Sequence, residues 1–406
     1  MRKILFVCNE GFDTPGPSNH LMNALLEDLL DYGFKVVLVQ SRRNYQNPDL
    51  PHNLQQKIDL EVVSVVRGAV SKNSFVKRYI EEAMYHFKAF LVWRSIQAVD
   101  VVFVQSCPTV LFSILLLKVF TKTPVVYSIQ DMWPGSAVNS GVIKNMLVAN
   151  VFYVLQKLAY KYCDVVTVIS EDMSKKVVEQ GVDHKKIVLI PNWVDDLTVH
   201  EVPWAENRFV KKYGLSNEKF YVQYAGTMGY VFDYEMVLLV AGKLGGYAGI
   251  EFHMIGQGSQ KDVFMREAIK RGLHNIKFFP IEPQHMVADV YSACSICFIP
   301  LKRGIIGNSV PSKAGLLMAC RRAILSSVDE NSQFYRMFNH YGIGVSVSNT
   351  DHDLVAKAVV ELYKDSEKRN LLASKGHEFG KDYYGRRTNT KKFAAIFENI
   401  AREGSM

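Results

Sequence analysis

Short apolar runs alternate with amphipathic stretches along most of the chain. The runs are rich in β-branched and aromatic residues, which favours strands, and the stretches between them repeat apolar residues at helical spacing. Because the runs are almost continuously apolar, we expect parallel strands covered by helices on both faces. The predicted strands before residue 191 span residues 3–8, 35–40, 60–65, 100–105, 124–129, 164–169 and 187–190. The predicted helices between them span residues 21–30, 74–98, 109–120, 143–162 and 171–180.

The same alternation starts again after residues 191–196, where proline, asparagine and two acidic residues form a natural hinge. A last amphipathic helix, at residues 389–403, could cross back and pack on the first half. The pattern predicts an α/β protein of two doubly wound, Rossmann-like domains, residues 1–193 with 385–406 and residues 194–384. The predicted strands of the second half span residues 220–225, 251–255, 276–279, 295–300 and 323–326, and its predicted helices span residues 235–244 and 261–271.

Length and cysteine usage agree with this organisation. A chain of 406 residues suggests two domains. The six cysteines show no paired zinc spacing, and Cys294 and Cys297 lie in an apolar run, so buried thiols are expected and a metal site is not. Unpaired thiols fit a reducing cytoplasm. Since no apolar run approaches the roughly 20 residues of a spanning helix, we expect a cytoplasmic protein that is soluble or lies on a membrane surface.

Positive charge is concentrated in one part of the chain. The net charge is +8, and the stretch from Arg67 to Lys122 contains eight basic and three acidic residues together with several aromatic ones. Basic and aromatic residues on a long helix suit an anionic membrane surface. A packed helix with a solvated face is the alternative. Nucleic acid is not an expected partner, because no recognised binding motif accompanies the charge.

A glycine-containing loop follows the predicted strand at residues 295–300. It carries Lys302 and Arg303, and Ser312 is placed to cap a helix that starts near Lys313. A helix start with free N–H groups and nearby cations favours a phosphate. An ordinary strand-to-helix turn is the alternative, because this signal is weaker than a full phosphate-loop consensus.

Two positions in the first half also follow predicted strands, where α/β sheets place their ligands. The first loop contains Gly16, Ser18 and Asn19, but it lacks the dinucleotide pattern GxGxxG, so no nicotinamide site is predicted. Asp131 follows another buried run, beside Trp133. A carboxylate there could serve catalysis, and a helix or turn cap is the alternative.

Five short phrases of the chain carry a family resemblance. They are IPNWVD at residues 190–195, GTMG at 226–229, IGQG at 255–258, VPSK at 310–313 followed by Met318 and Ala319, and QDMWP at residues 130–134. The first four together resemble phrases of family 4 glycosyltransferases, which have the GT-B fold of two facing Rossmann-like domains. QDMWP resembles a phrase in bacterial O-antigen and capsule transferases such as L-fucosaminyltransferases. The resemblance covers nearly the whole chain.

The resemblance implies a retaining transfer of a sugar from a nucleotide donor, without a bound metal or cofactor. The donor is expected on the second half and the acceptor on the first, near the loop of Gly16, Ser18 and Asn19. Asp131 is the implied catalytic residue, which would orient a sugar hydroxyl, assist acceptor deprotonation or stabilise oxocarbenium-like charge. The implied donor and phosphate contacts are Gly226, Thr227, Gly229, Lys302, Arg303, Asn308, Ser309, Val310, Pro311, Ser312 and Lys313.

The chain departs from the family pattern in the donor loop. Many relatives carry two glutamates eight positions apart, where this chain has Asn308 and Leu316. Leu316 cannot accept a hydrogen bond, so the usual ribose contact is missing. Arg321 and Ala323 replace a usual glycine and proline, and the basic residues that often follow the glycine turn are absent. Phosphate binding would then depend more on Lys302, Arg303 or Lys313.

The expected function is transfer from a UDP-sugar, with a UDP-L-FucNAc-like donor as the subfamily expectation, to a lipid-diphosphate-linked acceptor in surface-polysaccharide assembly. The stretch from Arg67 to Lys122 would hold the enzyme at the cytoplasmic face of the membrane. Two alternatives stay open. One is a catalytically idle binding subunit, consistent with Leu316, and the other is a GT-B sugar-nucleotide epimerase.

Overall fold

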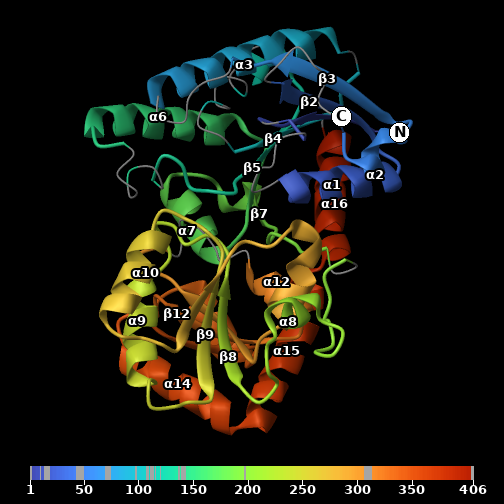
Figure 1. Ribbon diagram of the computed structural model, residues 1–406. Helices are drawn as coiled ribbons and strands as arrows, with labels where there is room; N and C mark the ends of the chain where they lie inside the picture. Colours follow the sequence, from blue (N-terminus) through green and yellow to red (C-terminus); the bar gives the residue numbers. More distant parts are fainter. Residues whose placement is uncertain are drawn as a thin grey trace. The chain divides into compact units, whose positions relative to one another are not determined.

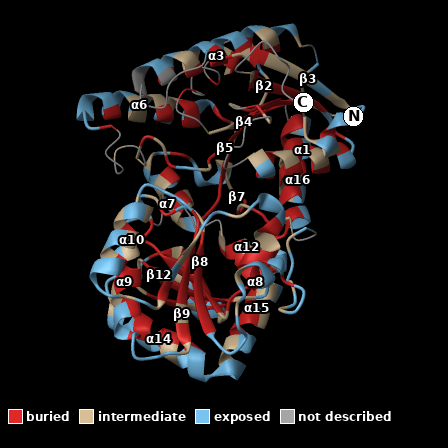
Figure 2. Ribbon diagram, in the orientation of Figure 1, coloured by how far each residue is buried: buried red, intermediate tan, exposed pale blue. Residues whose placement is uncertain are grey.

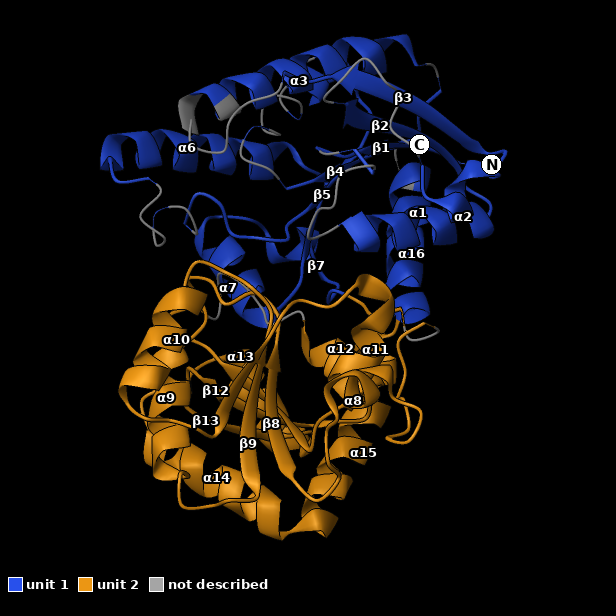
Figure 3. Ribbon diagram, in the orientation of Figure 1, with its two compact units in different colours: residues 1–192, 386–406 blue, residues 193–385 orange. Residues whose placement is uncertain are grey.

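The chain forms two compact units (Figure 3). Unit 1 is Met1–Asn192 with Arg386–Met406, and unit 2 is Trp193–Gly385. The predicted site residues Gly16, Ser18 and 308–312 fall outside the described residues. The computed structural model describes residues 2–9, 11–12, 19–42, 50–68, 75–96, 98–106, 109, 114, 116–118, 120–135, 138, 143–195, 198–305 and 313–403.

Unit 1 is built on a seven-stranded sheet in the order β3-β2-β1-β4-β5-β6-β7, and the neighbouring strands run parallel (Figure 1). Phe6 of β1 lies opposite Leu38 of β2 and Phe103 of β4, and all three side chains are buried. This arrangement is the predicted parallel sheet. The strands are β1 (Lys3–Val7), β2 (Lys35–Arg42), β3 (Leu60–Val66), β4 (Val101–Gln105), β5 (Val125–Ser128), β6 (Val165–Val168) and β7 (Ile187–Leu189).

The helices of unit 1 cover this sheet. Two of them start at caps that the sequence provides: Asn145 accepts from the N–H of Leu147 at 2.9 Å, and Ser170 accepts from the N–H of Met173 at 3.1 Å. The predicted helix at residues 109–120 lies partly outside the described residues. The described helices are α1 (Asn19–Asp31), α2 (His52–Gln55), α3 (Phe75–Ser95), α6 (Met146–Tyr162), α7 (Glu171–Glu179) and α16 (Arg386–Glu403), with the 3-10 turn η1 (His184–Lys186).

The last helix, α16, belongs to unit 1, as predicted. It packs against α1 and β4, where the rings of Phe393 and Phe397 meet Phe103 edge-on at centroid distances of 5.7 and 6.0 Å. At its start, the Arg386 guanidinium lies 2.8 Å from the carboxylate of the fully buried Asp28. The C-terminal helix therefore supplies both core and charge pairing to unit 1.

Unit 2 repeats the plan with a six-stranded parallel sheet in the order β10-β9-β8-β11-β12-β13. The predicted strands and helices of this unit are present, and Cys294 and Cys297 are buried free thiols with sulfur atoms 3.3 Å apart. The strands are β8 (Phe220–Ala225), β9 (Ile250–Ile255), β10 (Ile276–Phe279), β11 (Ile296–Pro300), β12 (Ala323–Val328) and β13 (Val345–Ser348). The helices are α8 (Arg208–Tyr213), α9 (Tyr234–Lys243), α10 (Lys261–Lys270), η2 (Gln284–Met286), α11 (Val287–Ser292), α12 (Lys313–Ala319), α13 (Gln333–Tyr341), α14 (His352–Lys364) and α15 (Ser366–Tyr384).

The structure adds elements that the sequence pattern did not predict. No element was expected between residues 327 and 388, yet β13, α13, α14 and α15 lie there and complete unit 2. Each unit buries a core on both faces of its sheet, with the exposed residues on the outer sides of the helices (Figure 2). None of the helices in the described ranges is both long and apolar enough to cross a membrane.

Candidate functional site

The predicted donor residues of unit 2 gather where its strand order changes direction. β8 lies between β9 and β11, so the loops that leave β8 and β11 diverge at the carboxyl edge of the sheet. Open α/β sheets bind ligands at such a point. The loop after β8 contains Gly226, Thr227 and Gly229, and the loop after β11 contains Lys302 and Arg303.

The turn after β8 packs tightly on the turn after β9. Gly226 has φ 145° and Gly256 has φ 135°, conformations that side chains rarely adopt. A Cβ on Gly256 would overlap the carbonyl oxygen of Gly226. The N–H of Gly226 donates to the Ile255 carbonyl and the N–H of Met228 to the Gln257 carbonyl, each at 2.8 Å. The two glycine phrases therefore hold each other in place.

These bonds correct one expectation about the turn. Gly226 is among the expected phosphate contacts, but its N–H group, like that of Met228, is already used within the protein. Thr227 is exposed, and the N–H groups of Thr227 and Gly229 have no acceptor among the described residues. Those two amides are the ones left for a ligand.

Lys313 reaches this turn from α12, although it is far away in the sequence. Its Nζ lies 4.0 Å from the centroid of the Tyr224 ring and so close to Gly226 that a Cβ there would overlap it. Within the described part of the chain, no carboxylate pairs with the amine. Burial lowers the pKa of Lys313 to about 7, and the Cys297 thiol opposes this shift weakly. A buried amine without an acidic partner is poised to receive an anion.

Lys302 and Arg303 take different positions from Lys313. The N–H of Lys302 donates to the Val231 carbonyl at 3.1 Å, and its Nζ lies 5.8 Å from the centroid of the Tyr234 ring. Arg303 is exposed. The structure thus brings Lys313, and neither of these two residues, onto the glycine turn.

An acidic residue that the sequence did not single out holds the start of the donor loop. The Asp329 carboxylate, just after β12, accepts from the N–H of Gly304 at 3.0 Å. The Asn349 amide donates to Asp329 at 3.3 Å and to the Leu301 carbonyl at 3.1 Å. The only available signal was the place of Asp329 after an apolar run.

Asp131 of unit 1 lies in the loop that follows β5. The N–H of Gln130 donates to the Ser106 hydroxyl at 3.1 Å, which ties this loop to the end of β4. Asp131 is exposed, and none of the described residues donates to its carboxylate. Partial desolvation raises its pKa. The carboxyl group is thus available to a ligand and does not act as a cap within the described residues.

The ring of Trp133 fixes the Asp131 loop to two helices. It lies 5.8 Å from the ring of Tyr79 on α3 and 4.4 Å from the ring of Phe152 on α6, measured between centroids. Tyr79 and Phe152 are 6.0 Å apart. We call these three rings the aromatic triad.

Of the predicted acceptor loop, Asn19 can be placed. It is the first residue of α1, and its amide donates to the Gly11 carbonyl at 3.1 Å. This bond closes the base of the loop after β1. Among the described residues, no group of three or more histidine, cysteine or acidic side chains is arranged to hold a metal ion.

Comparison with known proteins gives the chain its family. Residues 18–193 match the model of the glycosyl transferase 4-like domain, and residues 206–379 match that of glycosyl transferases group 1. The chain is a family 4 glycosyltransferase with the GT-B fold.

Individual relatives of this glycosyltransferase agree. It is 25% identical over 322 residues to the probable glycosyltransferase WbjE of Pseudomonas aeruginosa, covering 77% of this chain and 78% of that one. It is 26% identical over 208 residues to WcaI of Escherichia coli, named a candidate glycosyl transferase of colanic acid biosynthesis, covering 50% and 51%. The structure of HepE of Anabaena with UDP-glucose matches with a TM-score of 0.73 and 13% identity, over 98% of this chain and 100% of that one.

Leu316 of the glycosyltransferase lies on α12, where many relatives carry the second glutamate. Its side chain is partly buried and packs against the core of unit 2. The position therefore serves packing.

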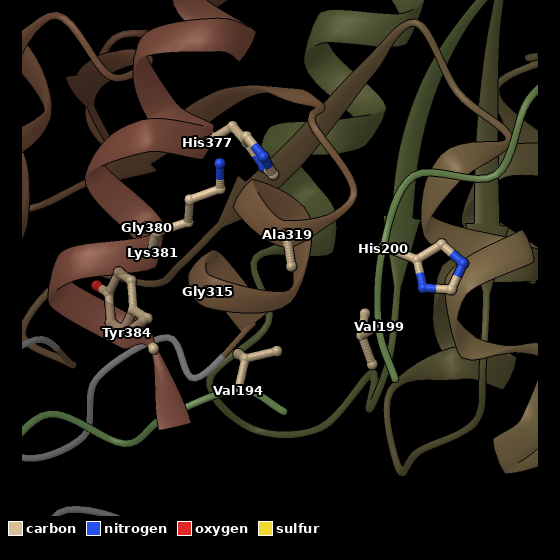
Figure 4. Close-up of a pocket in the computed structure, with 10 residues that line it drawn as sticks. Val194, Val199, His200, Gly315, Ala319, His377, Gly380, Lys381 and Tyr384 are labelled. Atoms are coloured by element: carbon tan, nitrogen blue, oxygen red, sulfur yellow. The ribbon is translucent and has the colours of Figure 1, made fainter. Parts of the chain in front are cut away.

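A small pocket of unit 2 lies elsewhere (Figure 4). It is lined by Gly315 and Ala319 of α12, by His377 and Tyr384 of α15 and by the segment that starts at Val194. His377 is held by its Nδ1, which lies 2.9 Å from the Met318 carbonyl oxygen. None of the predicted site residues lines this pocket, so the pocket is separate from the turn at residues 226–229.

Proposed function

We propose that this glycosyltransferase transfers a sugar, with retention, from a UDP-sugar to a lipid-linked saccharide in bacterial surface-polysaccharide assembly. The observation that carries the proposal is the position of Lys313 on the Gly226 turn, at the edge of the sheet where a diphosphate would bind. The relation to WcaI supports the polysaccharide context, and the HepE complex supports a UDP-sugar donor.

The proposed chemistry begins with the leaving group. As the bond between the sugar and the diphosphate breaks, negative charge grows on the diphosphate oxygens, and preorganised donors must meet it. Lys313 and the N–H groups of Thr227 and Gly229 are the assigned donors. We assign Lys302 and Arg303 to the outer part of the donor, together with the loop residues Asn308, Ser309, Val310, Pro311 and Ser312.

Asp131 is the proposed catalytic residue of unit 1. Its carboxyl group has no donor among the described residues and is partly desolvated, which suits a group that must bind a sugar hydroxyl or take up a proton. We place the acceptor near Gly16, Ser18 and Asn19. The reaction as proposed uses no resident metal or cofactor, since the nucleotide sugar is a substrate.

The donor sugar is proposed from the resemblance of residues 130–134 to L-fucosaminyltransferases. A UDP-L-FucNAc-like donor is the specific form of the proposal. Since Leu316 packs in the core, the ribose hydroxyls would bind to Asn308 or to backbone groups.

A lipid-linked acceptor places the enzyme at the cytoplasmic face of the membrane. Two basic residues of the stretch from Arg67 to Lys122 are paired inside unit 1, Arg67 with Glu82 at 2.8 Å and Lys118 with Asp164 at 2.6 Å. Lys77, Lys88 and Arg94 of α3 remain exposed. They are the residues we assign to anionic lipid.

The test combines binding and turnover with the purified protein. A thermal-shift panel of UDP-, GDP- and dTDP-sugars should show stabilisation by the UDP-sugars, and incubation with a lipid-linked acceptor should yield a glycosylated lipid with a retained anomeric configuration by NMR. Binding without turnover of any donor would instead identify an idle subunit. A changed sugar nucleotide in the absence of acceptor would identify an epimerase.

A further inference from the structure

Helix α6 presents an apolar face to solvent. Leu147, Val151 and Val154 are 77%, 58% and 58% exposed, and their spacing of four and three residues places them in one stripe along the helix. Met146 and Val148 at its start are exposed as well. We call Leu147, Val151 and Val154 the α6 apolar face (Figure 2 shows the exposed positions of this helix).

The charged residues on α6 are all basic. The helix contains no acidic residue, while Lys157 and Lys161 on it and Lys144 just before it are exposed. A second copy of the chain would bring two lysine-bearing, acid-free faces together, which is unfavourable. An anionic bilayer instead offers acyl chains to the apolar side chains and phosphates to the lysines.

The side of α6 opposite the α6 apolar face packs on the protein. Ala149 is buried, and Phe152 belongs to the aromatic triad with Tyr79 and Trp133. The helix is therefore already packed on the protein along one side. Its 17 residues span about 26 Å, which suits a helix lying in the plane of the interface.

We propose that α6 inserts into the interface of an anionic bilayer, with Leu147, Val151 and Val154 among the acyl chains. This inference deepens the proposed function, on which it rests for its purpose, because it names the surface by which the transferase would reach a lipid-linked acceptor. Trp133 stands two residues after Asp131 and packs on Phe152, so a seated α6 would hold the Asp131 loop at the bilayer surface.

The first test is flotation with phosphatidylcholine vesicles, with and without phosphatidylglycerol. Val151→Asp and Leu147→Asp should each lower partitioning into anionic vesicles by roughly ten-fold or more, because each removes an apolar side chain that the bilayer would bury and adds a charge that anionic lipid repels. Ile269→Asp is the matched control, since Ile269 is 77% exposed on α10 of unit 2. Partitioning of Val151→Asp equal to that of the unsubstituted protein would overturn the proposal.

The second test measures depth and does not depend on losing binding. Because the protein contains four tryptophans, intrinsic fluorescence would not report on α6 alone. A thiol-linked, environment-sensitive fluorophore is therefore placed at Val151→Cys and, for comparison, at Ile269→Cys. The label at position 151 should shift to the blue and be quenched by brominated acyl chains, and the label at 269 should not. An unquenched label at position 151 would contradict insertion. A protein that binds no lipid but sediments as a dimer, which Val151→Asp dissociates, would contradict it as well.

Failure of the inference is distinguishable from failure of the proposed function. UDP binding by calorimetry should be the same in Val151→Asp and the unsubstituted protein, because α6 belongs to unit 1 and the turn at residues 226–229 to unit 2. Lipid binding that depends on Val151, in a protein that binds no sugar nucleotide, would support the α6 surface and contradict the proposed UDP-sugar donor. Turnover of a UDP-sugar by a protein that binds no lipid would support the donor and contradict the α6 surface.

Discussion

At the scale of single residues, Lys313 is the side chain whose surroundings most clearly indicate an anion site. A buried lysine amine without an acid nearby is costly, and proteins keep such groups mainly where they are used. Lys313 lies over the Tyr224 ring and against Gly226. From there its charged amine can replace the basic residues that are missing after the glycine turn.

Replacing Lys313 by alanine should weaken UDP binding by roughly 10- to 100-fold, because a charge-assisted contact to phosphate is lost. Isothermal titration calorimetry measures this directly. Lys302→Ala serves as the control, with a smaller loss expected because Lys302 lies at Tyr234 and not on the turn. Equal affinities for Lys313→Ala and the unsubstituted protein would remove Lys313 from the phosphate site.

Donor affinity should also depend on pH. Since burial lowers the pKa of Lys313 to about 7, the free amine is charged below that pH and neutral above it. Binding of a diphosphate above pH 7 then requires uptake of a proton, and affinity should fall by about ten-fold per pH unit until the pKa of the bound state is reached. In Lys313→Arg the side chain stays charged and this slope should vanish. The same slope in both proteins would assign it to another group.

The lowered pKa of Lys313 makes the stability of the unliganded protein change with pH in the direction opposite to donor affinity. An unfolded lysine binds its proton up to about pH 10.4, so between about 7 and that value the unfolded chain holds more protons at this position than the folded one. The contribution of Lys313 to the free energy of unfolding therefore rises with pH over this window. Donor binding weakens where the unliganded protein gains stability.

Asp131→Asn should lower kcat by roughly 100-fold while leaving the dissociation constant for the donor nearly unchanged, because the amide keeps the shape but cannot accept a proton. Steady-state kinetics with calorimetry on the same preparation separate the two quantities. An unaltered kcat would exclude Asp131 from the chemistry.

At the scale of helices and strands, the sequence pattern succeeded where an element is apolar by itself. β8 reads FYVQYA and is buried throughout, so it was predictable from composition alone. β13 reads VSVS, with two apolar residues, and it is a strand because β12 offers it an edge to pair with. Such an element depends on its neighbour and leaves little trace in its own sequence.

α15 shows a second reason for failure. Glycines count against a helix, yet Gly376 and Gly380 lie within it on the side that meets α12 and Ile343. The contact of Lys313 with Gly226 was equally hidden, because 87 positions separate the two residues and only the fold brings α12 to the turn. The donor loop as a region was predictable, but the partner of its lysine was not.

The packing of α15 yields a prediction at this scale. Gly380→Ala should lower the free energy of unfolding by about 1–3 kcal/mol, although alanine favours helices, because the added Cβ would lie 2.8 Å from Cβ of Met318. Denaturant unfolding measures the difference. Gly242→Ala is the matched control, since Gly242 also lies in a helix, α9, and its Cβ would lie at an ordinary 3.6 Å from Cδ2 of Leu273. A stabilised Gly380→Ala protein would show that α12 can move away without cost.

At the scale of the whole molecule, the return of the chain to unit 1 is the organising feature. Asp28 of α1 is fully buried, and Arg386 and Thr390 of α16 bind it at 2.8 and 2.7 Å. Arg387 approaches the same carboxylate at 3.2 Å from a half-exposed position. A charge buried in this way is tolerated only with its partners present.

Arg386→Met should destabilise unit 1 by about 3 kcal/mol, because the buried carboxylate of Asp28 loses its main partner. Arg387→Met, the exposed neighbour, should cost less than about 1 kcal/mol. Hydrogen exchange read separately for the two units should show faster exchange in unit 1 alone. Equal effects of the two substitutions would mean that Asp28 does not rely on Arg386.

The two crossings at Asn192–Trp193 and Gly385–Arg386 make unit 2 an insertion within unit 1. During synthesis the ribosome releases all of unit 2 before α16 emerges. Until then, α1 and β4 of unit 1 lack the helix that packs on them. The part of the enzyme that is made first therefore receives its last helix only at the end of synthesis.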